Sequence, residues 1–157
     1  MKQEIILLNL LNPLFYVSEK IPDAFANPFE NTSATDLKKR ETLYCFEIDE
    51  RAAVEFEPGR QYFPGTMVFA GRISAEKIAE NNKNNPALLE LPRGNYVFSQ
   101  MRGFPGKDEI ISLIIEVQQE CLWQRLVPGP GFYLRYIYED NSPVIQVFRP
   151  YKNRETL

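Results

Sequence analysis

The chain has 157 residues, of which 44% are hydrophobic and 25% charged, and its formal net charge is −3. These values are typical of one globular domain large enough to bury a core. The chain contains no histidine, which excludes histidine-activated nucleophiles, histidine acid/base catalysis and the usual histidine metal sites. The acidic balance, without a basic face, excludes direct nucleic-acid binding.

The N-terminal segment is apolar but has the features of neither a signal peptide nor a membrane span. A signal peptide begins with a basic region, and Glu4 lies where that region would be. Pro13 ends an apolar run that is much shorter than the roughly 20 residues of a membrane helix. Cys45 and Cys121 lie in apolar patterns without CxxC spacing, which favours buried, reduced thiols. We therefore expect a cytoplasmic protein with no membrane contact, no metal and no cofactor.

Residues 1–85 are expected to form the divergent first half of a single domain that spans residues 1–157. Residues 18–35 contain two prolines and several Asn and Asp residues without periodicity, which predicts a long irregular loop. Short helices are predicted over residues 34–41 and from Ser74 onward. Apolar or alternating patterns predict strands over residues 4–11, 14–17, 43–48, 53–57 and 66–73.

Residues 86–157 are expected to form a second half with the order strand, helix, strand, strand. Alternation predicts strands over residues 95–101, 132–138 and 144–148, and the last two are close enough in sequence to form a hairpin. A long helix from Lys107 is predicted because apolar residues recur at helical spacing. They are Ile110, Leu113, Ile114, Val117 and Cys121, and Ile111, Ile115 and Leu122 widen the face. The predicted class is α+β, an antiparallel sheet with helices on one face.

Two short motifs of the second half suggest a family. The segment LPRGNYV at residues 91–97 is followed by Gly103, and LVPGPGF at residues 126–132 follows the predicted helix. With the βαββ order, these segments resemble the gyrase-inhibitor-like (GyrI-like) domain, which is also the effector-binding domain of some MerR- and AraC-type transcription regulators. The resemblance implies a duplicated βαββ arrangement and the binding of small molecules. The glutamate that the family often places in its third strand falls on Leu134 here, so the resemblance supports no cation contact at that position.

The aromatic residues are the main positive signal for a site, with 8 Tyr, 11 Phe and 1 Trp. If the predicted strands of the second half are adjacent, their aromatic side chains could line a cleft for a flat, hydrophobic or cationic ligand. Glu47 is a carboxylate on a predicted strand and could supply the anion of this cleft. The alternative is that the aromatics pack the core and Glu47 faces solvent. The candidate ligand-binding residues are Glu47, Tyr96, Phe98, Trp123, Tyr136 and Tyr138.

The sequence therefore predicts a non-enzymatic module that binds a small aromatic or hydrophobic ligand. Two alternatives stay open. A hydrolase could use carboxylate and tyrosine chemistry, provided that residues such as Glu47 and Tyr96 converge on one pocket. A protein-interaction domain could instead pair an exposed sheet edge with a partner.

Overall fold

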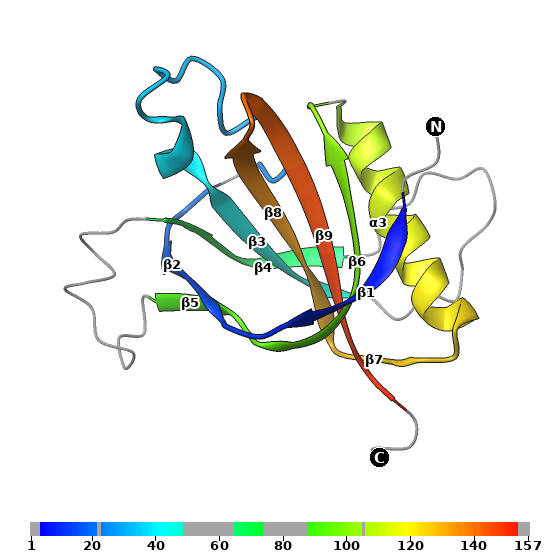
Figure 1. Cartoon of the computed structure of the whole chain (residues 1–157). Coiled ribbons are helices and arrows are strands. Elements are labelled where there is room, and N and C mark those ends of the chain that lie inside the picture. The colour runs from blue at the N-terminus through cyan, green and yellow to red at the C-terminus, as the bar shows by residue number, and fades with distance from the viewer. Residues whose placement is uncertain (1–3, 22, 49–64, 74–87, 105, 154–157) are drawn as a thin grey trace.

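The computed structural model describes residues 4–21, 23–48, 65–73, 88–104 and 106–153 (Figure 1). In this part of the chain the strands are β1 (Ile5–Leu10), β2 (Leu14–Ser18), β3 (Thr42–Ile48), β4 (Gly65–Arg72), β5 (Leu88–Leu91), β6 (Gly94–Arg102), β7 (Val127–Pro128), β8 (Gly131–Glu139) and β9 (Ser142–Lys152). The helices are the 3-10 helix η1 (Leu37–Arg40) and the α-helix α3 (Lys107–Trp123). The class is therefore α+β.

Most predicted elements are confirmed in position, including the β8–β9 hairpin and the long helix from Lys107. The helix predicted over residues 34–41 is only a short 3-10 turn. No separate pattern predicts β5 and β7, because strands of four and two residues are too short to show one. The strand predicted over residues 53–57 and the helix predicted from Ser74 lie outside the described residues.

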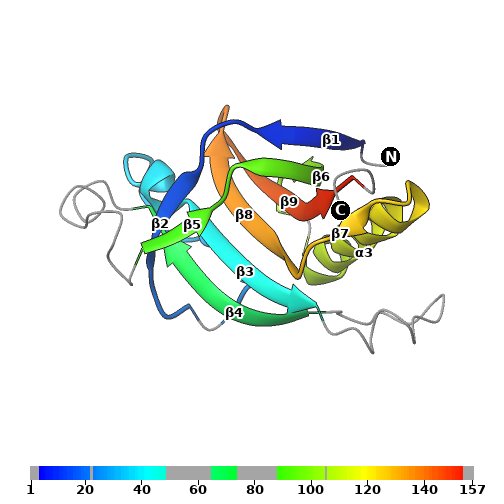
Figure 2. The same ribbon diagram turned by 90° about the horizontal axis from the view of Figure 1, so that it is seen from below.

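The sheet is antiparallel and strongly curled, and its strand order is β1-β6-β9-β8-β3-β4-β2-β5 (Figure 2). Its two ends belong to the same bent ribbon. β1 continues into β2 and β5 into β6, while β1 pairs with β6 and β2 pairs with β5. The ribbon bends at residues 11–13 and 92–93, between these pairings. The curl therefore gives the sheet a concave inner face and a convex outer face.

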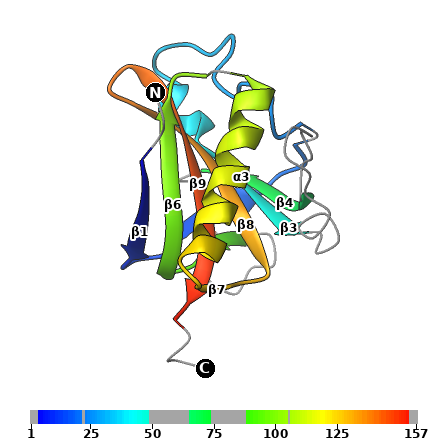
Figure 3. The same cartoon turned by 90° about the vertical axis from the view of Figure 1, so that its right-hand side faces the viewer.

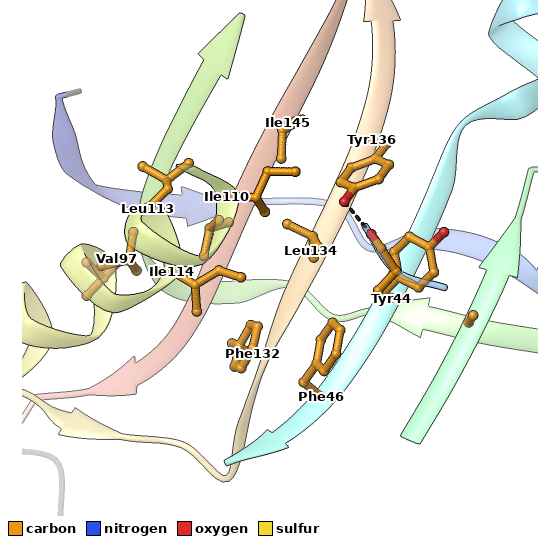
Figure 4. Packing of buried hydrophobic residues seen from close by; sticks show 14 of the residues in the cluster. Tyr44, Phe46, Val97, Ile110, Leu113, Ile114, Phe132, Leu134, Tyr136 and Ile145 are labelled. Carbon is orange, nitrogen blue, oxygen red and sulfur yellow. Dashed lines mark hydrogen bonds between the residues drawn. The ribbon is translucent and has the colours of Figure 1, made fainter. Parts of the chain in front are cut away.

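Helix α3 lies on the outer face, over β6 and β9 (Figure 3). Its buried residues join outward-facing side chains of β3, β6, β8 and β9 in what we call the outer cluster (Figure 4). Within it, the Phe46 and Phe132 rings stack with their centroids 4.9 Å apart. Leu122, which the periodicity assigned to the buried face, is instead 57% exposed. It lies in the last turn of α3, one residue before the C-terminal Trp123 of that helix.

The segment between β2 and β3 covers the outer face beside α3. Phe29 packs on Tyr138, with ring centroids 5.5 Å apart, and the Tyr136 hydroxyl donates a hydrogen bond to the Ala24 carbonyl. The irregular loop predicted for this segment is confirmed, and it contributes to the core. Among the described helices, none is long and apolar enough to span a lipid bilayer.

Candidate functional site

The concave face is lined by side chains from nearly every strand. Its apolar residues form the inner cluster, with Tyr16, Leu43, Leu91, Tyr96, Phe98 and Phe148 at its centre. Alternation along each strand places these residues opposite to those that contact α3. The register then arranges them in rows across the sheet, and the rows differ in chemistry.

One row is polar and contains an ion pair that is largely buried inside the curled sheet. Arg135 Nη2 donates to Glu41 Oε2 at 2.9 Å, Arg135 Nε donates to the Tyr16 hydroxyl at 2.7 Å, and Nη1 donates to Gln146 Oε1 at 2.8 Å. Gln146 in turn donates to Gln100 Oε1 at 3.0 Å. Burial raises the pKa of Tyr16, so its hydroxyl remains protonated and donates to Glu41 at 2.5 Å. Because the polar groups satisfy one another, this network is structural rather than a free binding group.

The neighbouring row is apolar. Phe69 faces Cys45, Cys45 faces Tyr133, Tyr133 faces Phe148, and Phe148 faces Phe98, each across a pair of adjacent strands. The Phe98 and Phe148 ring centroids are 4.9 Å apart. The row is buried at Phe98 and reaches solvent at Phe69, which is 52% exposed. It therefore forms an aromatic wall that leads from the core to the surface.

This wall borders a pocket of about 530 Å³ at one open end of the curled sheet, which we call the mouth pocket. Residues from both sequence halves line it: Cys45, Phe46, Glu47, Phe69, Pro92, Arg93, Gly94, Asn95, Tyr96, Pro130, Gly131, Phe132, Tyr133, Pro150, Tyr151 and Lys152. Its size and its mostly apolar lining are typical of small-molecule sites, which often occupy the open ends of curled sheets.

Tyr96 stabilises the bend beside the pocket. Its hydroxyl donates a hydrogen bond to the Pro92 carbonyl, and its ring lies edge-on to Phe148 and Tyr133. Burial raises the pKa of Tyr96, and it raises the pKa of Tyr133 to about 12. Both phenols are therefore protonated at neutral pH and act as aromatic surfaces, not as bases.

Among the residues that the structure describes, few polar groups line the mouth pocket. Glu47, Arg93 and Lys152 are exposed at its rim, and Cys45 is half-buried in its wall. Burial, with a smaller effect of Glu47, raises the pKa of the Cys45 thiol to about 11. The thiol is therefore protonated near pH 7 and is not an activated nucleophile. The pocket thus combines aromatic surface with charges of both signs at the rim.

The turn before β8 forms part of the rim, and Arg149 fixes it. Arg149 Nη1 donates to the carbonyls of Gly129 and Gly131 at 2.8 and 2.5 Å. Burial lowers the pKa of Arg149 to about 10, and its Nε has no hydrogen-bond partner within the described structure. A Cβ atom at Gly131 would lie 2.1 Å from the Phe46 carbonyl oxygen, so only glycine permits this approach of β8 to β3.

The structure brings together two of the six predicted site residues. Glu47 and Tyr96 both line the mouth pocket. Phe98 lies behind it in the inner cluster and is 9% exposed. Trp123 is 84% exposed at the end of α3 and lines a different groove.

Tyr136 and Tyr138 lie on the opposite face of the sheet from Tyr96 and Phe98. The expectation that these four residues occupy adjacent strands is wrong, because β9 lies between β6 and β8. Tyr136 is completely buried in the outer cluster, and Tyr138 packs against that cluster. Neither lines the mouth pocket.

Sequence reasoning missed the aromatic wall, whose accessible parts are the exposed Phe69 and the half-buried Tyr133. The alternation along β8 places Tyr133 and Tyr136 on opposite faces, which was a usable signal. It could not show that the face of Tyr133 is also the face of Tyr96, because that depends on strand order. No family model matches the chain, and no curated protein matches it significantly.

Proposed function

We propose that this protein is a non-enzymatic binding module that takes a small aromatic or hydrophobic ligand into the mouth pocket. The observation that carries the proposal is the aromatic wall, which continues from the inner cluster to the exposed Phe69 ring at the opening. A flat ligand stacked there would cover Phe69 and Tyr133. Covering exposed apolar surface is favourable by about 25 cal/mol per Å².

Glu47 supplies the acidic contact for a ligand that carries a positive charge. The family resemblance would have placed such a carboxylate at position 134, where this chain has a buried leucine of the outer cluster. Glu47 comes instead from the first half of the chain and lies at the pocket rim. A hydrophobic cation would therefore combine aromatic contact with charge pairing, whereas a neutral aromatic ligand would use the wall alone.

We also propose that the domain is a duplicated βαββ arrangement of the GyrI-like type. The pairing pattern supports this, because β4 pairs with β2 and β3 as β9 pairs with β6 and β8. The segment between β2 and β3 would replace the first helix, since it covers the outer face beside α3. The free thiols of Cys45 and Cys121 are compatible with a cytoplasmic location.

Thermal-shift and calorimetric titration with tetraphenylphosphonium, a hydrophobic cation, and with neutral naphthalene derivatives test the binding proposal. We expect saturable binding that Phe69→Ser weakens for both probes and Glu47→Gln weakens only for the cation. Leu11→Ser is the matched control, because Leu11 is 77% exposed and lies outside the mouth pocket. Equal effects of Phe69→Ser and Leu11→Ser, or no saturable binding, would contradict the proposal.

A hydrolase is the second candidate, because Glu47 and Tyr96 do line one pocket. The Tyr96 hydroxyl is already bound to the Pro92 carbonyl and its pKa is raised, so Glu47 would have to be the general base. Hydrolysis of p-nitrophenyl esters that Glu47→Gln abolishes would support this function. Absence of turnover, with binding retained, would leave the binding module as the function.

A further inference from the structure

Strand β1 lies at a border of the curled sheet. It pairs with β6 on one side, and no strand in the described part of the chain pairs with its other side. Figures 2 and 3 show it at the edge of the molecule. A strand edge of this kind presents unpaired N–H and C=O groups, which can bind another extended segment by strand addition.

Exposed apolar side chains surround this edge on both faces. Leu7 is 47% exposed on the side of α3, and Ile6 is 40% exposed on the inner side. A groove of about 570 Å³ runs between Ile5 and the C-terminal half of α3, where Leu122 and Trp123 are 57% and 84% exposed. Trp123 is the only tryptophan of the chain and its most exposed large apolar residue within the described part.

The charge of this groove is acidic. Glu116 and Glu120 line it together with Gln119, and none of the lysines or arginines that the structure describes does. Among the described residues, neither glutamate forms an ion pair, although Glu120 Oε1 accepts a hydrogen bond from Gln124 at 2.9 Å. The carboxylates and the face of the Trp123 ring would all attract a cation.

We infer that the β1 edge and this groove form a docking site for an extended segment of another protein in which basic and β-branched residues alternate. Alternate side chains of an added strand point to opposite faces. Those on the helix side would meet Trp123, Glu116 and Glu120, which suits arginine, because its stem covers apolar surface and its head pairs with carboxylates. Those on the other side would lie beside Ile6, which suits valine or isoleucine.

A second copy of this chain fits the same edge less well. A two-fold axis that pairs β1 with its symmetry mate would place both α3 helices on the same side of the joined sheet. Each helix would then present its acidic groove toward the other, and the described residues of neither copy would supply a basic group there. The charge of the groove therefore favours a basic partner.

The full chain can be tested with a capped synthetic peptide in which Arg and Val alternate. Binding is followed by the fluorescence of Trp123, and sedimentation velocity reports self-association. A peptide with Glu in place of each Arg tests the charge, and an Arg/Val peptide with N-methyl groups on alternate residues tests the strand pairing. Glu116→Lys changes the groove, while Glu30→Lys makes the same charge change at an exposed position outside it.

We expect the Arg/Val peptide to shift Trp123 emission to shorter wavelength and to bind at least about tenfold more tightly than either control peptide. Glu116→Lys should weaken binding to a similar extent and Glu30→Lys should not. Equal binding of the Arg/Val and Glu/Val peptides, equal effects of the two substitutions, or no binding would overturn the inference. A protein that self-associates, loses this self-association with Leu7→Lys and does not bind the peptide would overturn the inference. In that case the β1 edge would pair with a second copy of the chain.

Discussion

Arg135 and Glu41 form an ion pair inside the curled sheet, with Nη2 2.9 Å from Oε2 and with side chains only 17% and 16% exposed. Glu41 directly precedes β3, and Arg135 lies in the middle of β8. The pair therefore connects the two sequence halves across the β3–β8 junction. The Tyr16 hydroxyl bridges it from a third strand.

Glu41→Gln is expected to lower the free energy of unfolding by about 3 kcal/mol, because it leaves the Arg135 charge buried without its counterion. Chemical denaturation measures this loss. In the double variant Glu41→Gln/Arg135→Met, the loss should be smaller than the sum of the two single losses. If Glu41→Gln costs no more than Glu30→Gln at an exposed position, the pair contributes nothing to stability.

Gly131→Ala is expected to destabilise the protein by about 1–3 kcal/mol, the usual range for overpacking. The added Cβ would lie 2.1 Å from the Phe46 carbonyl oxygen, so β8 and β3 would have to separate. Ligand affinity at the mouth pocket should fall with stability, because both strands line it. Pro130→Ala in the same turn is the control, and an equal loss in both variants would show that the close approach is unimportant.

Cys45 is expected to react slowly with iodoacetamide at pH 7. Burial raises its thiol pKa from 9.0 to about 11, so the thiolate fraction, and with it the rate, should still be rising between pH 9 and 11. Mass spectrometry of the digested protein separates Cys45 from the buried Cys121. A pocket ligand should slow the reaction of Cys45 further. A rate that levels off near pH 9 would contradict the raised pKa.

Stability should decrease at alkaline pH. Burial raises the pKa of Tyr44 and Tyr133 from 10.0 to about 12, so the folded state keeps protons that the unfolded state loses. This stabilisation is complete below pH 10 and is lost as the pH rises toward 12. Denaturation at several pH values measures the slope, and Tyr133→Phe should reduce it. A slope unchanged by Tyr133→Phe would show that its phenol ionises as in the unfolded chain.

Local patterns in the sequence predict most of the elements and the two faces of the longer strands. A period of two residues requires that Tyr133 and Arg135 point away from Phe132, Leu134 and Tyr136, and the structure confirms this separation. Helical spacing likewise predicted the buried side of α3, apart from Leu122 in its last turn. These patterns are local, so they can be read along the chain without knowledge of neighbours.

Which strand faces come together depends on the tertiary structure. Strand order places β9 between β6 and β8, and so separates Tyr96 from Tyr136, which the sequence had grouped. The curl of the sheet brings Glu47 of the first half and Tyr96 of the second to one pocket. Register and curvature depend on pairings between distant segments, and no local pattern encodes them.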